Sequence, residues 1–269
     1  MKTDFTAQGR NGVLVLALLL IVNLTTFAQA SAPVIAEVRL LKVEPQNSAE
    51  FEKLIKEVFK PVAQMRKQNG QITGWQFYKI DFAGTDDPYQ YATVHVYNAW
   101  EKTEPKQSLA DQVKTALPKA DANAIMTKAL GLAKIVRIGL YERVDGVALK
   151  PDVRTKYVFM NFMKVKEGMD DAYLDSETKD WKPVFQEMSD TGKRAGWGLW
   201  VTAYPGGTAK THDYVTTDIY TSYSQIFESM TDAFKKVHAN QDITLFFQKA
   251  GKTRDLVRSE LWELLDAVN

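Results

Sequence analysis

The stretch 60–75, KPVAQMRKQNGQITGW, recurs in the same chain as 182–197, KPVFQEMSDTGKRAGW. Each residue shared by the two stretches recurs after 122 positions, so they align without a gap. The same interval relates Lys42 to Lys164, and further along the register drifts by one residue. Solenoid repeats have periods of about 20 to 50 residues, so this spacing indicates a duplicated domain. The repeated Lys-Pro-Val and Gly-Trp motifs are expected to serve structure.

Hydrophobic periodicity predicts the same order of elements in both copies. The first copy predicts strands at 34–43, 72–81, 89–98 and 134–144, and helical regions at 48–68 and 100–130, the latter interrupted at Pro118. The second copy predicts strands at 157–165, 197–204, 213–221 and 254–265, and helical regions at 169–190 and 224–250. Pro61 and Pro183 lie inside the first helix of each copy, so a kink or break is expected there.

The βαββαβ order is that of a ferredoxin-like domain. Two such units in tandem resemble the dimeric α+β barrel superfamily, and the duplicated layout most resembles its NIPSNAP and antibiotic-biosynthesis-monooxygenase-type proteins. The resemblance implies an α+β fold in which two tandem ferredoxin-like repeats form one intramolecular pseudo-dimer, with two sheets facing each other and helices outside. It carries no catalytic motif, because the superfamily includes cofactor-independent oxygenases, isomerases, haem enzymes and proteins without known activity.

The first thirty residues have the order of a secretory signal peptide. Lys2 and Arg10 precede the apolar run 13–22, and Ala28-Gln29-Ala30, with small residues at its first and last positions, precedes Ser31. The run is too short to span a bilayer comfortably, so we expect residues 1–30 to be removed and the protein to be periplasmic or secreted. The rest of the chain divides into a first repeat at 31–145, a linker at 146–156 and a second repeat at 157–269.

Charge and composition argue against several kinds of partner. Without Lys2, Arg10 and Asp4, the chain has 32 basic and 32 acidic residues, whereas nucleic-acid binders and polybasic membrane anchors carry a basic surplus. We therefore expect no nucleic-acid partner and no membrane partner after signal removal. The composition leaves the oligomeric state open. The chain has no cysteine and three histidines without close pairing, so no disulfide and no metal site are expected.

Strand alternation predicts which side chains face the helices and which face the other sheet. In strand 91–97 the apolar set, Ala92, Val94 and Val96, is expected to pack on the helices. The opposite set would then line the space between the two sheets. Applied to both copies, this assignment predicts seven ligand-binding candidates there: Arg39, Tyr91, Tyr97, Arg137, Tyr214, Asp218 and Arg258.

A space lined in this way suits a small molecule with an aromatic body and an acidic or carbonyl group. Arginine binds carboxylates in a planar, bidentate manner, and aromatic side chains provide stacking surface. His95, the counterpart of Asp218, is the candidate general acid or base because imidazole titrates near neutral pH. The structural alternative is that the arginines pair with Glu37 and Glu260.

Three classes of function stay open on these observations. The favoured one is an exported protein that binds a small molecule between its sheets and needs no cofactor. The resemblance also implies an enzyme, either a cofactor-independent oxygenase or isomerase that uses His95 and nearby tyrosines, or a haem protein with His95 or His238 as ligand. The third class is an envelope interaction or scaffold module whose interior is filled by side chains.

Overall fold

The computed structural model describes residues 32–208 and 210–269. The first half of this part contains β1 (Ile35–Val43), η1 (Pro45–Asn47), α1 (Ser48–Leu54), η2 (Ile55–Phe59), α2 (Lys60–Gln68), β2 (Gly74–Asp81), β3 (Tyr91–Tyr97), η3 (Trp100–Lys102), α3 (Leu109–Ala116), α4 (Ala122–Leu132) and β4 (Ala133–Val147). The second half contains β5 (Tyr157–Val165), α5 (Asp170–Asp175), η4 (Ser176–Trp181), α6 (Lys182–Asp190), β6 (Gly196–Tyr204), β7 (Tyr214–Tyr220), η5 (Tyr223–Phe227), α7 (Thr231–Val237), α8 (Ile243–Thr253) and β8 (Arg254–Val268). The expected signal peptide, 1–30, lies outside the described residues.

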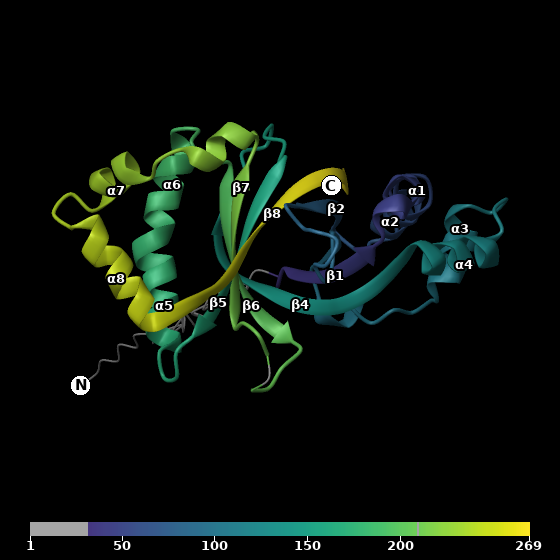
Figure 1. Cartoon of the computed structure of the whole chain (residues 1–269), viewed down its shortest axis with the longest axis horizontal. Helices are drawn as coiled ribbons and strands as arrows, with labels where there is room; N and C mark the ends of the chain where they lie inside the picture. Colours follow the sequence, from purple (N-terminus) through teal and green to yellow (C-terminus); the bar gives the residue numbers. More distant parts are fainter. Residues whose placement is uncertain (1–31, 209) are drawn as a thin grey trace, which may run out of the picture. The chain divides into compact units, whose positions relative to one another are not determined.

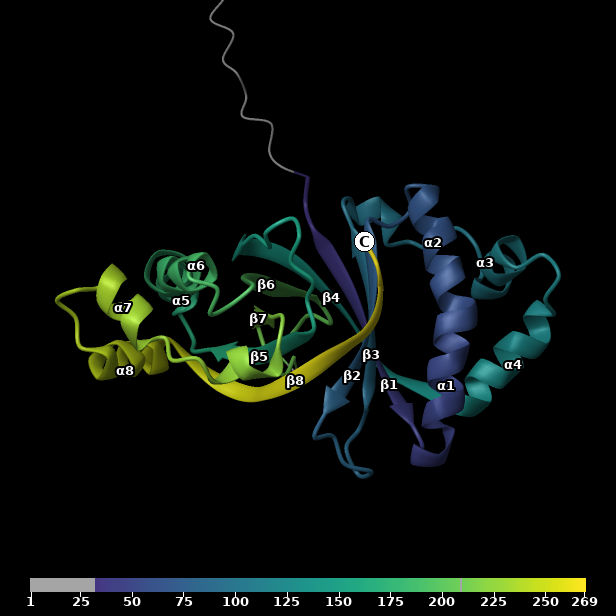
Figure 2. The same cartoon turned by 90° about the horizontal axis from the view of Figure 1, so that it is seen from above.

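The strands of the described residues form one closed barrel, in the order β1-β3-β2-β8-β5-β7-β6-β4. Each half contributes a four-stranded antiparallel sheet with its last strand beside its first, which is the ferredoxin-like order. The pairs β2 with β8 and β4 with β6 join the two sheets. Figures 1 and 2 show α1–α4 outside one sheet and α5–α8 outside the other. The predicted fold class is confirmed.

The two prolines expected to kink the long helices are accommodated by π-helical turns. The turn η2 ends at Phe59, and η4 ends at Trp181, so each proline occupies the second position of the α-helix that follows. Proline has no N–H to donate to the preceding turn. A wider π-turn just before it lets the helix continue through the proline in both halves.

The lysine of the repeated Lys-Pro-Val motif joins the two halves. Lys60 Nζ, on α2, donates to Asp266 Oδ1 on β8 at 2.7 Å. Lys182 Nζ, on α6, donates to Asp145 Oδ1 on β4 at 2.6 Å. Each aspartate oxygen also accepts a hydrogen bond from the backbone N–H of the next residue. We call these two ion pairs the inter-half clasps, because each connects a helix of one half to the last strand of the other.

The sheet separates an inner core from two outer cores. Val38, Met160 and Trp262 belong to the core inside the barrel. One outer core lies under the helices of the first half and includes Phe51 and Trp75, while its counterpart in the second half includes Trp181 and Trp197.

Four strands present the reverse of the predicted faces. On β3, Val94 and Val96 line the barrel interior, while His95 and Tyr97 face the helices. The same reversal holds for β1, β5 and β7, on which the alternation assigns Val38, Met160 and Val215 to the helix side, whereas they line the barrel interior. Tyr141 on β4 and Trp262 on β8, which the same alternation assigns to the space between the sheets, do line that interior. Both faces of a closed, helix-covered sheet are buried, so apolar alternation alone does not identify the helix side. The face with more aliphatic side chains is the one that lines the barrel interior.

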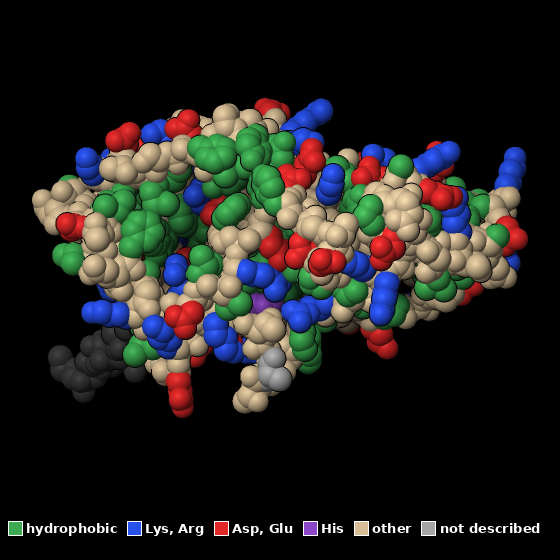
Figure 3. Space-filling model, in the orientation of Figure 1, with side chains coloured by type: hydrophobic (Ala, Val, Ile, Leu, Met, Phe, Trp, Pro, Cys, Tyr) green, Lys and Arg blue, Asp and Glu red, His purple; other side chains and the backbone are tan. Residues whose placement is uncertain are grey.

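No helix among the described residues is long and apolar enough to cross a membrane. Over the face shown in Figure 3, Lys and Arg side chains are interspersed with Asp and Glu side chains. This face therefore carries no large patch of one sign of charge.

Candidate functional site

Two cavities among the described residues lie on opposite faces of the barrel sheet. The first, which we call the sheet–helix pocket, lies in the first half between the strands and α1–α4, with a volume of about 410 Å³. The second, which we call the barrel cavity, lies inside the barrel and has a volume of about 930 Å³. Both volumes fall in or near the range of about 300 to 1,000 Å³ that small-molecule sites occupy.

A chain of polar side chains runs along the floor of the sheet–helix pocket. In the pairing of β1 with β3, Glu37 lies opposite His95. The Arg39 guanidinium pairs with Glu37, and the Tyr97 hydroxyl donates to Glu37 Oε2 at 3.1 Å. From α2, Arg66 Nη2 donates to the Tyr97 hydroxyl at 3.4 Å. Two arginines and one carboxylate therefore give this floor an excess of one positive charge.

Three buried polar atoms in the same pocket have no hydrogen-bond partner among the described residues. They are His95 Nδ1, Arg66 Nε and Gln112 Oε1, and all three residues line the sheet–helix pocket. A buried polar group left unpaired costs about 1–3 kcal/mol, more when it is charged. Native structures contain few such groups, and each calls for an explanation. All three atoms are available for a hydrogen bond to a molecule, water or ligand, that enters the pocket.

Burial and charge fix the protonation states in the pocket. Burial lowers the pKa of His95 well below its usual value, and the positive charges of Arg39 and Arg66 lower it further. Burial raises the pKa of Tyr97, helped by the negative charge of Glu37 and opposed by Arg66. At neutral pH the pocket therefore presents a neutral imidazole and a protonated phenol.

The remaining wall of the pocket is apolar and largely aromatic. Phe51 comes from α1, Phe59 from η2 and Trp75 from β2, and Met126 and Leu130 come from α4. Phe51 and Trp75 are buried, whereas the side chain of Leu130 is exposed. The pocket thus combines a polar floor with ring surfaces. Its exposed lining residues are Pro105, Gln107 and Ser108 before α3, Leu130 on α4 and Ile135 on β4.

The equivalent region of the second half is occupied by its own side chains. Phe185 stands 122 positions after Ala63, and Trp181 stands 122 positions after Phe59. Trp181 packs edge-on to Phe246 with ring centroids 4.7 Å apart, and Phe185 packs on Trp197 at 5.5 Å. Larger aromatic residues in the second half therefore take the space that is open in the first.

The predicted site residues lie in three places rather than one. Arg39, His95 and Tyr97 meet in the sheet–helix pocket, but under the helices and not between the sheets. Tyr91 lies in the neighbouring core, where its hydroxyl donates to Glu52 at 2.9 Å.

Tyr214 and Asp218 lie under the helices of the second half. The Tyr214 ring packs against Tyr173 with centroids 4.9 Å apart, and Asp218 forms a buried ion pair with Arg194. These contacts make both residues part of the filled outer core. They do not approach the pocket of the first half, because the two outer cores belong to different sheets.

Arg137 and Arg258 lie on the barrel strands β4 and β8. Arg258 Nε lies 2.8 Å from Glu260 Oε1, and its guanidinium stacks on Phe162 at 4.1 Å. Arg137 donates to Thr211 Oγ1 at 3.3 Å. The structural alternative, pairing of arginine with a carboxylate, therefore describes Arg258 with Glu260, and it also describes Arg39 with Glu37.

Sequence reasoning missed Arg66 and Gln112. Arg66 did leave a signal, because it stands in the apolar-periodic helix 48–68 where the second copy has Met188. A charged residue at a position that is apolar in the other copy suggests a local change of environment. Gln112 left no such signal, because it lies on α3, where the two copies of the repeat do not align closely.

The histidines differ in what they offer a cofactor. His238 Nε2 lies 3.0 Å from the carbonyl oxygen of Asp180, and its ring packs between Phe234 and Phe246, so His238 does not fit as an axial haem ligand. His212 Nε2 lies 3.2 Å from the Tyr141 hydroxyl. Among the described residues, His95 is left as the histidine that faces a pocket, and no cluster of three metal-binding side chains was found there.

These features define the class of protein. A closed barrel made of two βαββαβ halves, with helices outside each sheet, is the dimeric α+β barrel fold, here formed within one chain. The predicted resemblance is confirmed at the level of the fold.

Comparison with solved structures supports this fold. A protein from Fusobacterium nucleatum subsp. nucleatum, assigned as a monooxygenase, superposes with a TM-score of 0.52 at 8% identity, covering 89% of this chain and 95% of its own. An anthrone oxidase-like protein gives 0.46 at 11% identity (89% and 94% covered), and a protein assigned as a chlorite dismutase gives 0.49 at 10% (87% and 96%). The last two scores are too low to carry an argument, and identities this low show the fold alone. No protein-family profile and no curated protein sequence matches the chain.

Proposed function

We propose that the protein binds a small aromatic molecule with an acidic or carbonyl group in the sheet–helix pocket of its first half. The observation that carries the proposal is the set of three unpaired buried atoms around that pocket: His95 Nδ1, Arg66 Nε and Gln112 Oε1. A ligand that forms hydrogen bonds to all three atoms would remove the free-energy cost of burying each of them unpaired.

The chemistry of the three atoms defines the ligand. Arg66 Nε is a donor and requires an acceptor, such as a carboxylate or a carbonyl oxygen. Gln112 Oε1 is an acceptor and requires a hydroxyl or an amine. The excess positive charge of the floor favours an anion, and Phe51 and Trp75 provide surfaces for a ring. A hydroxylated aromatic acid satisfies all of these requirements.

A second candidate is an enzyme that removes a proton from the bound molecule. The observation that favours it is a neutral His95 with an unbonded ring nitrogen in the pocket, beside Tyr97 and Glu37. A neutral imidazole is the form that accepts a proton from a bound molecule within hydrogen-bond reach, and the lowered pKa of His95 makes it a weak base for this step. Consumption of oxygen or appearance of a new product on mixing with a phenolic ligand distinguishes an oxygenase or isomerase from a binding protein.

Haem is an alternative occupant of the same pocket. His95 would supply a nitrogen ligand to its iron, and Arg39 and Arg66 would pair with its carboxylates. A Soret absorption band in the purified protein would identify haem and would exclude the small aromatic acid as the ligand of this pocket.

The predicted signal peptide leads us to propose that this binding takes place in the periplasm or outside the cell. Cell fractionation followed by N-terminal sequencing tests this. Protein that begins at Ser31 in the exported fraction is expected. Protein that keeps Met1 and stays in the cytoplasm would contradict the export proposal without affecting the binding proposal.

Titration with 4-hydroxybenzoate, followed by tryptophan fluorescence and calorimetry, tests the binding proposal. Arg66→Met copies the second half, which has Met188 at this position, and removes the charged donor. A charge-assisted hydrogen bond contributes about 1.5–3 kcal/mol, so the affinity should fall about tenfold to a hundredfold. Ala63→Phe copies Phe185 and fills the pocket, so it should abolish binding.

Lys67→Met is the matched control. It removes the same charge from the next residue of α2, and Lys67 does not line the pocket. Its affinity for 4-hydroxybenzoate should stay within about twofold of the unmodified protein. Equal losses for Lys67→Met and Arg66→Met would mean that the ligand responds to net charge alone. Unchanged binding by Ala63→Phe would place the ligand elsewhere.

A further inference from the structure

The barrel cavity is a second space, separate from the sheet–helix pocket. Its volume is about 930 Å³, and among the described residues no side chain lines both cavities. Protein interiors are packed as densely as organic crystals and leave few voids larger than a water molecule. The barrel cavity is open to solvent on one side and is large enough to admit a small molecule.

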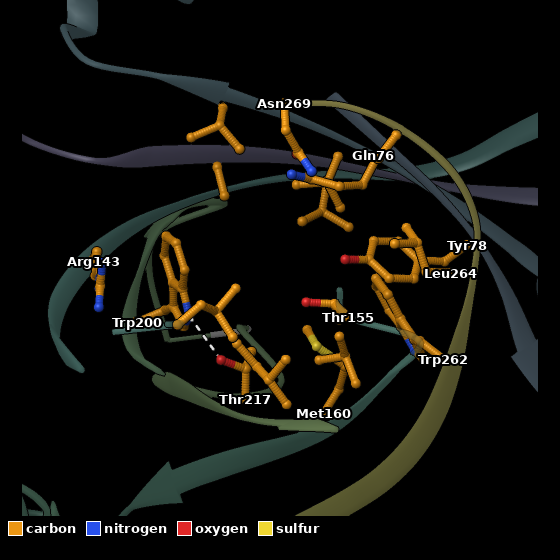
Figure 4. A pocket seen from close by; sticks show the side chains of 18 of the residues that line it. Gln76, Tyr78, Arg143, Thr155, Met160, Trp200, Thr217, Trp262, Leu264 and Asn269 are labelled. Atoms are coloured by element: carbon orange, nitrogen blue, oxygen red, sulfur yellow. Dashed lines mark hydrogen bonds between the residues drawn. The ribbon is translucent and has the colours of Figure 1, made fainter. Parts of the chain in front are cut away.

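The wall of the barrel cavity is mostly apolar. Val94 from β3, Val158 and Met160 from β5, and Val215 from β7 point inward. Trp200 and Trp262 stand on different sides of the cavity (Figure 4). The Trp200 indole is held at the wall by its hydrogen bond to Thr217 Oγ1, at 3.3 Å. Such a wall stabilises an apolar body and offers two indole rings for stacking.

Two hydroxyl groups enter this apolar space. Figure 4 shows the hydroxyls of Tyr78, from β2, and Thr155, from the segment 148–156 between the halves, both pointing into the cavity. Burial alone raises the pKa of Tyr78, without a contribution from a charged neighbour, so the phenol stays protonated. Together the two hydroxyls offer donors and acceptors to one neutral polar group.

The charged residues that line the barrel cavity are exposed to solvent. Arg143 is at the end of β4, and Asp152 and Arg154 belong to the segment 148–156; all three side chains are exposed. The deeper wall offers no charge to pair with an ionised ligand, and burying an unpaired charge is very costly. The exposed lining residues are those of this segment together with Arg143 and Asn269, so we place the entrance there.

We propose that the barrel cavity is a second ligand site, for a neutral and mostly apolar molecule with one hydrogen-bonding group that meets Tyr78 and Thr155. This site differs from the sheet–helix pocket in the face of the sheet, in its residues and in the charge of its ligand. The barrel cavity would be occupied independently of any acid bound under the helices.

A pair of fluorescent probes with the same ring system tests this proposal. N-phenyl-1-naphthylamine is neutral and has one N–H group, and 1-anilinonaphthalene-8-sulfonate adds a negative charge. The neutral probe should bind with one copy per chain and quench tryptophan fluorescence. The sulfonate should bind at least about tenfold more weakly, because the cavity has no partner for it.

Substitutions then locate the neutral probe. Val94→Trp fills the barrel cavity and should abolish its binding, and Tyr78→Phe should weaken it about threefold to tenfold by removing one neutral hydrogen bond. Thr155→Tyr fills the entrance from an exposed segment, so it serves as a second test if Val94→Trp does not fold. Ala63→Phe, in the sheet–helix pocket, is the control and should leave the neutral probe bound.

Two results would overturn the proposal. One is a folded protein that does not bind the neutral probe. The other is a probe that is displaced by Ala63→Phe but not by Val94→Trp or Thr155→Tyr, since it would then occupy the sheet–helix pocket. Because the binding proposal for 4-hydroxybenzoate rests on Ala63→Phe and Arg66→Met, either proposal can fail while the other holds.

Discussion

The two halves of this protein have the same fold and differ in what lies under their helices. In the first half, Ala63 and Phe59 leave a pocket whose floor carries His95 and Arg66. In the second half, Phe185 and Trp181 take the corresponding space and pack against the aromatic residues of the helices and the sheet. A few large side chains are therefore enough to convert a site into a core. The backbone is set by the repeated motifs, and the pocket by residues that are not repeated.

Opening the filled half should have the largest effect on stability. Phe185→Ala removes a buried ring that contacts Trp181, Trp197 and the Arg194 guanidinium. Phe-to-Ala substitutions in cores cost about 3–5 kcal/mol, and urea denaturation should show a loss of that size. Phe227→Ala, an exposed aromatic residue of the same half, should cost less than about 1 kcal/mol. A small loss for Phe185→Ala would mean that the second half already tolerates an open pocket.

The halves should also differ in their response to pH. Glu177 lies where the first half has the pocket residue Ile55, and burial raises its pKa to about 7, against the opposing charge of Arg254. A carboxyl whose pKa is raised by folding stabilises the protein below its unfolded pKa, and this contribution is lost as the pH rises towards 7. Glu177→Gln should remove this loss.

The difference in unfolding free energy between Glu177→Gln and the unmodified protein should therefore change by about 3 kcal/mol between about pH 4 and pH 8, in favour of the variant at high pH. Urea denaturation across this range measures it. Glu57→Gln, on an exposed side chain of η2, is the control and should show little change. If the difference in unfolding free energy for Glu177→Gln did not change with pH, ionisation of Glu177 in the folded protein would have no free-energy cost.

The smallest expected effect tests what the halves have in common. Lys60→Met and Lys182→Met each remove one inter-half clasp, and the two lysine side chains are 33% and 35% exposed. Partly exposed ion pairs contribute about 1 kcal/mol or less, so each variant should lose that much in thermal or urea denaturation. The two losses should be equal within about 0.5 kcal/mol and should add in the double variant, because the pairs share no residue. Unequal losses would show that the two interfaces between the halves are not equivalent.

The element order and the barrel could be predicted from the sequence because each element was read twice. Strand 157–165 and the helix ends near Gln68 and Asp190 agree with the structure closely, since the same periodicity appears in both copies. The role of Lys60 and Lys182 could be predicted only as structural. Their partners, Asp266 and Asp145, lie in the other half, and a sequence repeat does not show which halves touch.

The position of the site was harder to predict than the fold, because both faces of the barrel sheet are covered. Tyr97 and His95 alternate with valines on β3, and both sets are covered, one by helices and the other by the opposite strands. Alternation therefore identified which residues share a face but not which face is which. It grouped Arg39, His95 and Tyr97 correctly and placed them on the wrong side of the sheet.

The covalent segment 148–156 has a consequence for how such a protein can change over time. When a barrel is assembled from two identical chains, every substitution appears twice, so a bulky residue that improves one core also closes the other pocket. Joining the halves in one polypeptide removes this constraint. The two halves differ at one such position, with Ala63 in the first and Phe185 in the second. One half was free to gain packing while the other kept its opening. The joining segment thus made a division of labour possible within a symmetric architecture.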